Sequence, residues 1–435
     1  MIISGWGRHP RVICKVVKPK NIQEIKRSMK FKCIARGNGR SYGDCSLQPK
    51  LTIDTKNFKE IIKFDNRKGI VVVQPGILLK DLLKFIVAEG WFVPVTPGTK
   101  FVTIGGMVAA NVHGKNHHND GGIINFLNYI KVINHKKEMI LCSKNKNKKL
   151  FYASVGGMGL TGIITEVSIK LKKIYNSYIE QEIQVETSIE NLVKLLKKKS
   201  KKNYSVAWVD LANFSSSKVN SITYFGDHSK NPNLKLKVFE NRFLKLPSLL
   251  NYLISMLVIN SVVLKIFNFI YFIKNKYFFK ESTINYNKFF YPLDSLKNWN
   301  LLYGSKGMIQ YQFILPERLS LKGLKKIISF IKNNKMYSYL TTLKFMKKDP
   351  GNLSFPIKGF SMTLDFPVSE KNLNLVKHLD KIIEEFKGRI YLAKDARMSS
   401  DFVNKQYNIK KFSNFRAKIK KENYFSSIQS ERLKI

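Results

Sequence analysis

Short apolar runs separated by glycine turns dominate the first 175 residues of the chain. Runs such as 69–76 and 102–114 resemble strands cut by glycine, and 78–90 has the apolar spacing of an amphipathic helix. From about residue 176 the glycines become sparse, and Lys-rich helical and strand segments follow. The pattern predicts an α+β fold with a domain boundary near this point.

A second region, from Leu246 to Phe279, is strongly apolar and could in principle span a bilayer. At helical spacing, however, its polar positions fall within an arc of about 140°, with Asn260 outside it, and basic residues flank both ends. This favours an amphipathic helix over 246–273 that lies in a membrane interface. A helix packed against the protein's own core is the alternative, because periodicity alone cannot separate the two. The polar positions in the arc are Asn251, Ser255, Ser261, Lys265 and Asn268.

The composition is strongly basic, with 76 Lys and Arg against 30 Asp and Glu and a formal net charge of +46. Anionic partners are favoured, such as phosphate-bearing cofactors and substrates or acidic lipid. The alternative is that codon bias toward lysine produced the high charge, without any role in binding. The lysines are spread along the whole chain, whereas a nucleic-acid interface concentrates them on one face between aromatic residues. No nucleic acid is therefore expected, and a non-catalytic basic protein that binds nucleic acid or membrane remains an alternative.

The four cysteines form no C-x-x-C pair and no metal-ligand spacing, so we expect inert thiols in a reducing compartment and no metal site. The first residues contain no apolar region followed by a small-residue cleavage site. We therefore expect a cytoplasmic protein.

The first chemical motif is a loop with three glycines, residues 35–44, directly after the apolar FKCI. Such a loop can expose successive backbone N–H groups to a pyrophosphate, because glycine tolerates the required dihedral angles and lets the backbone approach closely. It is not a Rossmann fingerprint, since no helical pattern opens on it. An ordinary glycine turn is the alternative for this loop taken alone.

Further glycine loops follow at 97–106, 111–118 and 156–164, each beside an apolar run. A long dinucleotide lying across the fold would use all of them, whereas a single phosphate would not.

In their order and spacing, ARGNGRSYGD, PGT-x-x-VTIGG, HGKNHH and GGMGLTGII resemble the PCMH-type FAD-binding domain of the vanillyl-alcohol-oxidase superfamily. More narrowly, the chain resembles the decaprenylphosphoryl-β-D-ribose 2′-oxidase family, through FFYPLD, IQYQFILP and YLAKDAR among other motifs. The resemblance implies a two-part FAD-binding domain, 1–175 and 389–435, and an antiparallel-sheet substrate domain, 176–388. A helix at 246–273 between two parts of one domain can lie on a membrane but not cross it.

The resemblance also implies the site residues. The catalytic candidates are Lys394, which would stabilise the charge of the reduced flavin, and His113, which would accept or relay the hydroxyl proton. No His or Cys suited to a covalent flavin link lies in the first loop, so FAD is expected to be non-covalent. His117 and His118 are expected to be structural. The implied FAD-binding residues are Arg36, Gly37, Asn38, Gly39, Arg40, Ser41, Tyr42, Gly98, Thr99, Thr103, Gly105, Gly106, Asn111, Gly114, Gly159, Thr161, Gly162 and Ile164. The implied substrate residues are Lys115, Gln310, Gln312, Lys344, Met346, Thr363 and Tyr391.

Several positions depart from the family pattern and bear on the acceptor sugar and the lipid. Ser361 and Thr363 stand where the best-known members have an asparagine and a cysteine, Phe290 replaces a tyrosine, and Met346 replaces an aromatic residue.

The activity implied is oxidation of the ribose 2′-hydroxyl of a polyprenyl-phosphoryl ribose to a 2′-keto sugar. An NAD(P)H-dependent short-chain reductase would complete the epimerisation, and the enzyme would sit on the inner face of an anionic membrane. Oxidation of a soluble alditol, aldonolactone or hydroxy acid is the alternative within the same enzyme class.

Overall fold

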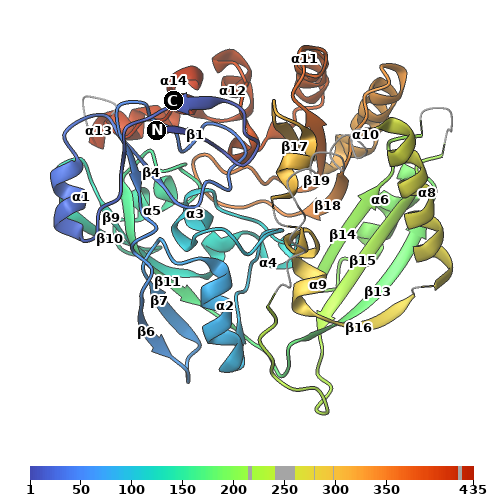
Figure 1. The fold of residues 1–435 in the computed structure, drawn as a ribbon, viewed down its shortest axis with the longest axis horizontal. Helices are drawn as coiled ribbons and strands as arrows, with labels where there is room; N and C mark the ends of the chain where they lie inside the picture. Colours follow the sequence, from blue (N-terminus) through green and yellow to red (C-terminus); the bar gives the residue numbers. More distant parts are fainter. Residues whose placement is uncertain (214–217, 241–259, 279, 297, 420–423) are drawn as a thin grey trace.

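The computed structural model describes residues 1–213, 218–240, 260–278, 280–296, 298–419 and 424–435 (Figure 1). Helices and sheets occur together along the chain, and the fold is α+β, as predicted. Small sheets built from the first 173 residues lie in one half of Figure 1, and a large antiparallel sheet lies in the other. The predicted domain limits at 175 and 389 stay predictions.

The N-terminal part contains a five-stranded antiparallel sheet of order β10-β9-β11-β7-β6 and a parallel sheet of order β3-β5-β4. Two-stranded pairs β1-β2 and β12-β8 complete it. The strands are β1 (Ile2–Ser4), β2 (Arg11–Ile13), β3 (Val16–Val17), β4 (Ile34–Arg36), β5 (Thr52–Asp54), β6 (Ile61–Asp65), β7 (Ile70–Val73), β8 (Trp91–Phe92), β9 (Leu127–Ile133), β10 (Met139–Cys142), β11 (Ile163–Lys170) and β12 (Lys172–Lys173).

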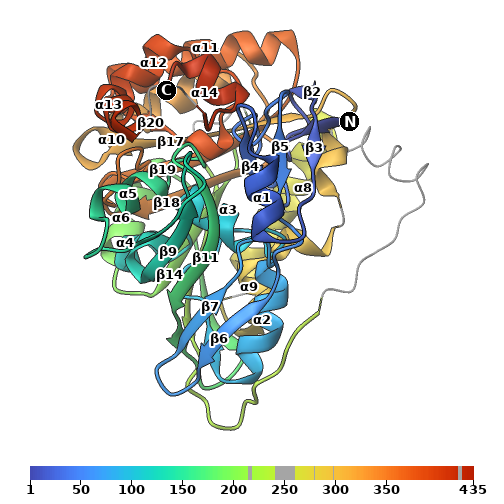
Figure 2. The ribbon, with the colours of Figure 1, turned by 90° about the vertical axis from the view of Figure 1, so that its left-hand side faces the viewer.

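Short helices connect these strands and cover them, as the side view in Figure 2 shows. The amphipathic pattern at 78–90 forms α2, which buries Leu79, Leu82, Leu83 and Ile86 and exposes its charged residues. The helices of this part are α1 (Ile22–Ser28), α2 (Leu79–Ala88), α3 (Ile104–Ala109), α4 (His117–Asp120), the 3-10 helix η1 (Ile123–Phe126) and α5 (Lys148–Ser154).

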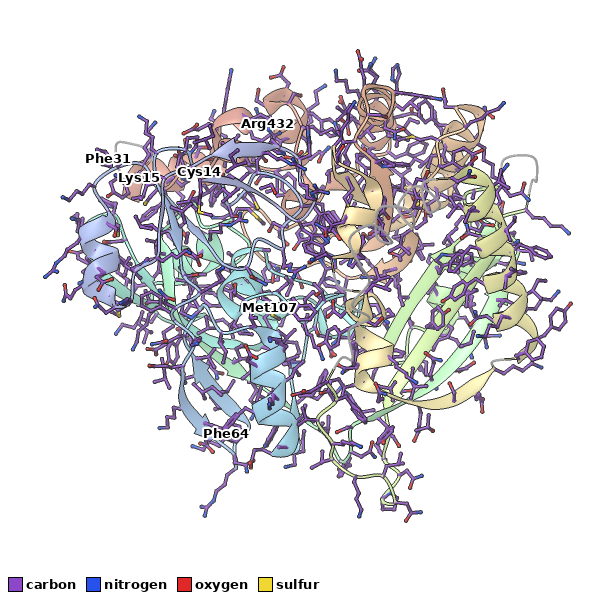
Figure 3. All side chains as sticks on the ribbon, viewed as in Figure 1. Cys14, Lys15, Phe31, Phe64, Met107 and Arg432 are labelled. Carbon is purple, nitrogen blue, oxygen red and sulfur yellow. The ribbon has the colours of Figure 1, made fainter. Side chains whose placement is uncertain are left out.

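The strand-like expectation for 102–114 is wrong over its middle, because α3 begins inside it. Thr103 caps the helix by accepting a hydrogen bond from the backbone N–H of Gly106 at 3.2 Å. Gly105 packs against Pro75, where a Cβ would lie 2.6 Å from the proline ring. The glycines therefore serve close packing at a helix start. Met107, labelled near the middle of Figure 3, belongs to the buried face of this helix.

The second part is built on an eight-stranded antiparallel sheet of order β16-β13-β15-β14-β18-β19-β17-β20. Its central strands are almost wholly buried. The strands are β13 (Tyr178–Glu186), β14 (Tyr204–Val209), β15 (Ser221–His228), β16 (Glu281–Asn285), β17 (Met308–Pro316), β18 (Thr341–Met346), β19 (Gly359–Pro367) and β20 (Arg389–Ile390).

Helices cover the two faces of this sheet unequally. One face carries α6, α10 and α11, and it buries Phe313, Phe360 and Leu364 in the largest apolar cluster. The helices of this part and of the C-terminal region are α6 (Ile189–Lys198), α8 (Ser261–Phe278), α9 (Tyr286–Phe290), η2 (Pro292–Ser295), η3 (Trp299–Tyr303), α10 (Glu317–Asn333), α11 (Glu370–Glu385), η4 (Leu392–Lys394), α12 (Ser400–Gln406), α13 (Ile409–Ile419) and α14 (Ile428–Leu433).

The opposite face is divided along its width. Over β13, β15 and β14 it is apolar and is covered by α8, whose Phe272 packs against Trp208 and Ile222. We call this region the apolar half. Over β18, β19 and β17 the same face carries polar side chains, and we call it the polar half. Alternation along each strand places these side chains on one face, because successive residues point to opposite sides.

The helix α8 presents apolar residues outward and two asparagines inward. Asn268 is buried, and its amide donates to a carboxylate oxygen of Asp210 at 2.7 Å. Ile266, Phe267, Phe269 and Ile270 are each more than half exposed. The polar arc expected from the sequence is therefore split, since Lys265 is exposed whereas Asn268 faces the sheet. The part of the predicted helix before residue 260, with Asn251 and Ser255, lies outside the described residues. Over the ranges that are described, no helix is long and apolar enough to cross a bilayer.

Candidate active site

The polar half brings several predicted substrate residues into one row. Gln310 and Gln312 on β17 face Asp365 and Thr363 on β19, and Lys344 on β18 pairs with Ser361. All lie on the same face because directly paired residues share a face and the period is two. The register therefore assembles amides, hydroxyls, a lysine and a carboxylate from three neighbouring strands. Met346, two residues beyond Lys344, is fully buried at the end of the row.

His113 joins the N-terminal part to this row. The amide nitrogen of Gln312 lies 2.8 Å from its Nε2 and 3.2 Å from the Ser361 hydroxyl. The ring of Tyr391 lies 4.9 Å from the imidazole, and the Tyr391 hydroxyl donates to the Ala110 carbonyl at 2.8 Å. When Gln312 donates to Nε2, the proton of a neutral imidazole resides on Nδ1, which has no hydrogen-bond partner among the described residues.

The charge around His113 keeps it neutral. Burial holds the pKa of this imidazole well below its usual value, and the positive charges of Lys344 and Lys394 and the neighbouring His117 act in the same direction. A neutral imidazole can bind a hydroxyl group by a hydrogen bond. It is a weak proton acceptor in this electrostatic environment.

Three lysines in the same region are only partly exposed and have no carboxylate in contact. Burial lowers the pKa of Lys115 to about 7, of Lys344 to about 8 and of Lys394 to about 7. Within the described ranges none of the three forms an ion pair. The Lys115 ammonium donates to the Phe289 carbonyl and lies 4.3 Å from the centre of that residue's ring. Such a cluster of cations is suited to an anionic ligand, because a buried charge is costly unless it is paired.

Lys394 lies next to the first glycine loop. Its ammonium is 3.7 Å from the centre of the Tyr42 ring, a cation–π contact, and the Tyr42 backbone N–H donates to the Ala393 carbonyl at 3.0 Å. Residues from both ends of the chain thus form one wall of the site. This contact places the lysine within reach of a ligand bound on the glycine loop.

The first glycine loop offers a row of backbone donors. In the part of the chain that the structure covers, the N–H groups of residues 38–41 have no acceptor. The Arg40 guanidinium lies 3.8 Å from the Trp6 ring centre, and its buried Nε also lacks a partner. The unpaired buried Nε requires a ligand or water, and the partly exposed backbone donors beside it are free to bind the same ligand. They fit the pyrophosphate expected from the sequence.

Glycine is required in this loop for two different reasons. Gly39 has a φ of +61°, and a Cβ there would lie 2.2 Å from the Arg36 guanidinium, so a side chain would displace Arg36. A Cβ on Gly37 would lie 2.1 Å from the Thr103 hydroxyl, which joins the first loop to the second. Asn38 strengthens that junction, because its side chain donates to the Phe101 carbonyl at 2.8 Å.

In the second loop, Gly98 differs from its neighbours because a Cβ there would meet nothing within 4 Å. Open space beside a glycine in a dinucleotide-type loop fits a cofactor that approaches the backbone. Gly105 and Gly106, by contrast, pack against Pro75 and Thr103. Together with the unpaired donors of the first loop, this space agrees with the chemistry of FAD.

Other predicted cofactor residues make contacts within the protein that hold the loops in place. The Asn111 amide holds the Asp349 carboxylate and the Ile124 backbone N–H, and the Thr161 hydroxyl lies 2.7 Å from that of Ser154. Ile164 belongs to the apolar core beneath the five-stranded sheet. The remaining positions are turns or internal contacts. Gly159 and Gly162 have positive φ, and Gly114 packs against Thr96. The Ser41 carbonyl accepts a hydrogen bond from the Trp6 N–H, and the Thr99 hydroxyl accepts one from the Phe101 N–H.

The two histidines after His113 are both bonded within the protein. His117 Nε2 lies 2.9 Å from the buried Asp349 carboxylate, and His118 Nε2 lies 2.8 Å from the Lys202 carbonyl. Asp349 also accepts from the Gly122 N–H at 2.8 Å. These bonds attach the loop that carries His113 and Lys115 to the large sheet.

A charged network fixes the turn that carries Lys394. Arg432, labelled in Figure 3, donates to Asp395 at 2.7 Å and to Asp44 at 2.9 Å. The Asp395 carboxylate also accepts the backbone N–H groups of Arg397 and Met398, each at 2.8 Å. Gly43 fits beneath the turn, where a Cβ would lie 1.8 Å from the Asp395 carbonyl. The C-terminal helix α14 thereby holds Lys394 against the first loop.

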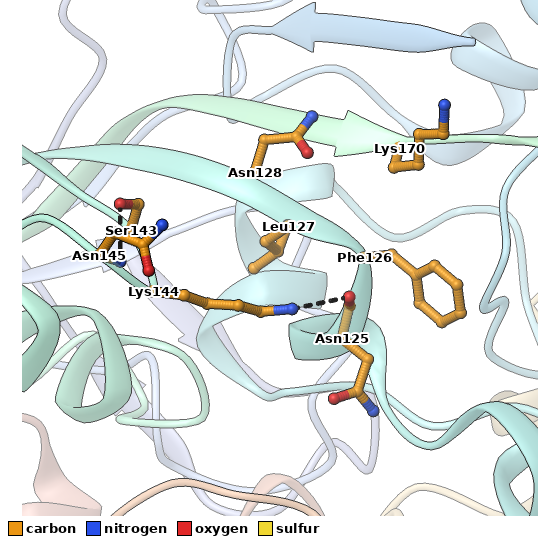
Figure 4. Close-up of a pocket in the computed structure, with 8 residues that line it drawn as sticks. All are labelled: Asn125, Phe126, Leu127, Asn128, Ser143, Lys144, Asn145 and Lys170. Carbon is orange, nitrogen blue, oxygen red and sulfur yellow. Dashed lines mark hydrogen bonds between the residues drawn. The ribbon is translucent and has the colours of Figure 1, made fainter. Parts of the chain in front are cut away.

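A separate pocket of about 300 Å³ lies over β9, the turn after β10 and the end of β11 (Figure 4). Its lining contains none of the predicted site residues, and the Lys144 ammonium that enters it already donates to the Asn125 carbonyl at 3.0 Å. Charge, burial and unpaired donors indicate the glycine loops and the polar half instead.

Sequence reasoning missed two carboxylates of the site. Asp365 was not among the predicted residues, although it continues the alternation of Ser361 and Thr363 along β19. Asp349 had no local signal, because its partners His117 and Asn111 lie more than 200 residues earlier in the chain.

Comparison with known proteins agrees with this site. Residues 14–143 match the family described as "FAD binding domain". The chain is 30% identical to the decaprenylphosphoryl-β-D-ribose oxidase of Mycolicibacterium smegmatis, over all of this chain and 97% of that protein. It is 26% identical to a putative D-arabinono-1,4-lactone oxidase of Neurospora crassa and 28% to a D-lactate dehydrogenase of Anaerostipes hadrus. These two matches cover 40% and 30% of this chain, and 32% and 28% of the relatives.

The fold and the glycine loops, together with these matches, define an FAD-dependent oxidoreductase with a PCMH-type FAD-binding domain. Within that class, the chain belongs to the decaprenylphosphoryl-β-D-ribose oxidase family.

Proposed function

We propose that the enzyme oxidises the ribose 2′-hydroxyl of a polyprenyl-phosphoryl-β-D-ribose to the 2′-keto sugar. The observation that carries the proposal is the set of partly exposed lysines without ion pairs beside the buried amides of Gln310 and Gln312. A phosphorylated sugar supplies both the anion and the hydroxyl groups that such a set can bind. The full-length similarity to an oxidase named for this substrate supports the same assignment.

Some residues of the site bind the substrate, and others stabilise the charge that develops during the reaction. Bound FAD would supply the redox chemistry by accepting a hydride from the carbon that bears the hydroxyl, and the hydroxyl proton would pass to water. Lys394 stabilises the negative charge that develops in that transfer, and Lys344 and Lys115 bind the substrate phosphate. His113, fixed by Gln312, donates a hydrogen bond from Nδ1 to a sugar hydroxyl, and Tyr391 forms part of the apolar wall.

Ser361, Thr363, Phe290 and Met346 are the departures from the family pattern, and three of them line or end the polar row. We assign them to the choice of sugar and lipid. Oxidation of a soluble aldonolactone, alditol or hydroxy acid is the second candidate. It is favoured by the similarity of part of the chain to a putative D-arabinono-1,4-lactone oxidase and a D-lactate dehydrogenase.

We infer that FAD is bound without a covalent link. The first loop contains no His or Cys between Arg36 and Asp44. Cys45, next in the chain, is buried, and burial raises the pKa of its thiol to about 11, which disfavours the thiolate needed for attack. Acid precipitation is expected to release all of the flavin into the supernatant, and flavin that remains with the polypeptide would contradict the inference.

We further propose that the enzyme binds peripherally to an anionic membrane on its cytoplasmic side. The exposed apolar residues of α8 lie on the helix that covers the apolar half, beside the polar half that would hold the sugar. Lys265, Lys274 and Lys276 lie on the same helix and would attract acidic headgroups. A polyprenyl chain could then remain in lipid while its phosphosugar enters the site. The second half of the epimerisation would require a reductase of the short-chain NAD(P)H-dependent type.

The test is anaerobic reduction of the bound flavin by a panel of substrates, followed by loss of absorbance. Polyprenyl-phosphoryl ribose is expected to reduce it fastest, with free ribose, ribose 5-phosphate, an aldonolactone and lactate as comparisons. Equal or faster reduction by a soluble member of the panel would favour the second candidate.

A further inference from the structure

The run GWGRHP near the start of the chain contains a segment, residues 5–8, to which the function proposed above assigns no role. The backbone of this segment lies along the end of the first glycine loop. The Trp6 N–H donates to the Ser41 carbonyl at 2.7 Å, and the Gly7 N–H donates to the Tyr42 carbonyl at 3.1 Å. The segment is therefore bonded to the same loop that carries the unpaired backbone donors.

The other side of this segment is bonded to the second part of the protein. The Asn300 amide donates to the Trp6 carbonyl at 2.8 Å, and the Met308 N–H donates to the Gly7 carbonyl at 2.7 Å. The ring of Trp299 packs edge-on against the Trp6 ring, with 5.9 Å between the ring centres. Trp6 is thus held by its N–H, its carbonyl and its ring, so that its side chain has a defined position beside the loop.

The Arg40 guanidinium of the first glycine loop lies over the Trp6 ring. Its central carbon is 3.8 Å from the centre of that ring and 5.4 Å from the centre of the Phe101 ring. In the ranges that the structure describes, this guanidinium forms no ion pair and no hydrogen bond, and its Nε is buried. Stacking uses the flat face of a guanidinium, whereas its N–H groups lie in the plane. The contact with Trp6 therefore leaves these N–H groups for an acceptor.

An anion is the acceptor that suits Arg40 best. The guanidinium is only partly exposed and has no carboxylate in contact, although a charge withdrawn from water normally needs compensation. Arginine is suited to phosphate, because two of its N–H groups can bind two oxygens at once. Residues 14–143, which include Arg40, match an FAD-binding domain. The pyrophosphate of FAD is therefore the candidate anion for this side chain.

We propose that Trp6 is a positioning residue for the cofactor, which holds the flat face of the Arg40 guanidinium so that its N–H groups bind the pyrophosphate of FAD. A free arginine side chain has many rotamers, and ordering it on binding lowers the affinity for a ligand. Trp6 fixes the side chain before the cofactor binds. The inference concerns the cofactor alone and is independent of which substrate is oxidised.

The test measures the rate at which FAD leaves the holoenzyme, followed by the rise of flavin fluorescence after dilution. Trp6→Leu removes the aromatic face and is expected to speed release by about 3- to 30-fold, which is the range of a cation–π contact. Trp6→Phe keeps an aromatic face and should restore most of the slow release. In the double variant Trp6→Leu, Arg40→Ala, release should be no faster than in Arg40→Ala alone, because Trp6 acts only through Arg40.

A series of fluorinated tryptophans at position 6 separates the charge of the ring from its shape. Fluorine withdraws electron density from the negative face of the ring and hardly changes its size, so release should become faster with each added fluorine. This series also covers the case that Trp6→Leu does not fold. Trp91→Leu is the matched control, because the Trp91 ring holds the Lys173 ammonium at 4.7 Å outside the glycine loops. It should leave the release of FAD unchanged.

Release of FAD at the unmodified rate in Trp6→Leu, or a rate that stays constant along the fluorine series, would overturn the inference. Faster release in the double variant than in Arg40→Ala would also overturn it, because Trp6 would then act on the loop by another route. Release is measured without substrate, so these outcomes are distinct from failure of the proposed function. That failure would instead be an absence of flavin reduction by polyprenyl-phosphoryl ribose in the unmodified enzyme.

Discussion

The two halves of one face of the large sheet bury polar groups in opposite ways. In the apolar half the side chains that contact α8 bond to one another: Asn268 bonds to Asp210, and the Tyr224 hydroxyl lies 2.5 Å from that of Tyr271. In and beside the polar half, Lys344 and Lys394 are only partly exposed and have no ion pair in the described residues. Buried polar groups are normally satisfied. The difference therefore separates structural polar groups from those that await a ligand.

The largest effect is expected from removing the charge next to the first glycine loop. Lys394→Met should leave the fold and most FAD binding intact and slow reduction of the flavin by about 100-fold or more, as for other preorganised electrostatic contacts. Lys394→Arg should restore the rate only in part, because a planar guanidinium cannot occupy the same position as an ammonium. Single-turnover reduction without oxygen measures the step. A normal rate in the Met variant would remove Lys394 from the mechanism.

The second effect concerns the phosphate. Lys344→Met should lower kcat/KM for the phosphorylated substrate by about 10- to 100-fold, because a charge-assisted hydrogen bond contributes about 1.5–3 kcal/mol. The loss should vanish when the substrate lacks phosphate. Lys335→Met, on the exposed surface, is the matched control. Equal losses with and without phosphate would place Lys344 among the structural groups.

The third prediction is that a polar group in the apolar half affects stability and not activity. Asn268→Leu leaves the Asp210 carboxylate without one of its donors, so it should lower the free energy of unfolding by about 1–3 kcal/mol. The rate of flavin reduction should not change. Denaturant unfolding and single-turnover kinetics on one preparation check both parts, and a slower reduction in the folded variant would contradict the division into halves.

The smallest effect on the protein itself is expected on the outer face of α8. Replacing Phe267 and Ile270 with serine should change the stability by no more than about 0.5 kcal/mol, because both side chains are exposed. Co-sedimentation with anionic vesicles should fall, and the remaining binding should weaken with salt. Ile62→Ser, an exposed apolar residue on β6, should have no effect on vesicle binding. Unchanged binding in the double variant would argue against a membrane role for α8.

The sequence predicted well what depends on local spacing. The glycine loops follow from turn chemistry and α2 from a period of 3.6, whereas Gln310, Gln312 and Thr363 were implied by the family resemblance and the register of β17 and β19 brings them to one face. It predicted less well what depends on distant partners. The inward side of α8 is set by Asp210, and residues 104–109 within the segment 102–114 form a helix because Thr103 caps it and Gly105 fits against Pro75.

The position of the new carbonyl group in the product tests the central claim most directly. Polyprenyl-phosphoryl ribose is oxidised in a single turnover, the product is reduced with borodeuteride, and the sugar is analysed by mass spectrometry. The account predicts deuterium at C2 in a mixture of ribose and arabinose epimers. Deuterium at any other carbon, or no incorporation although the flavin has been reduced, would contradict it.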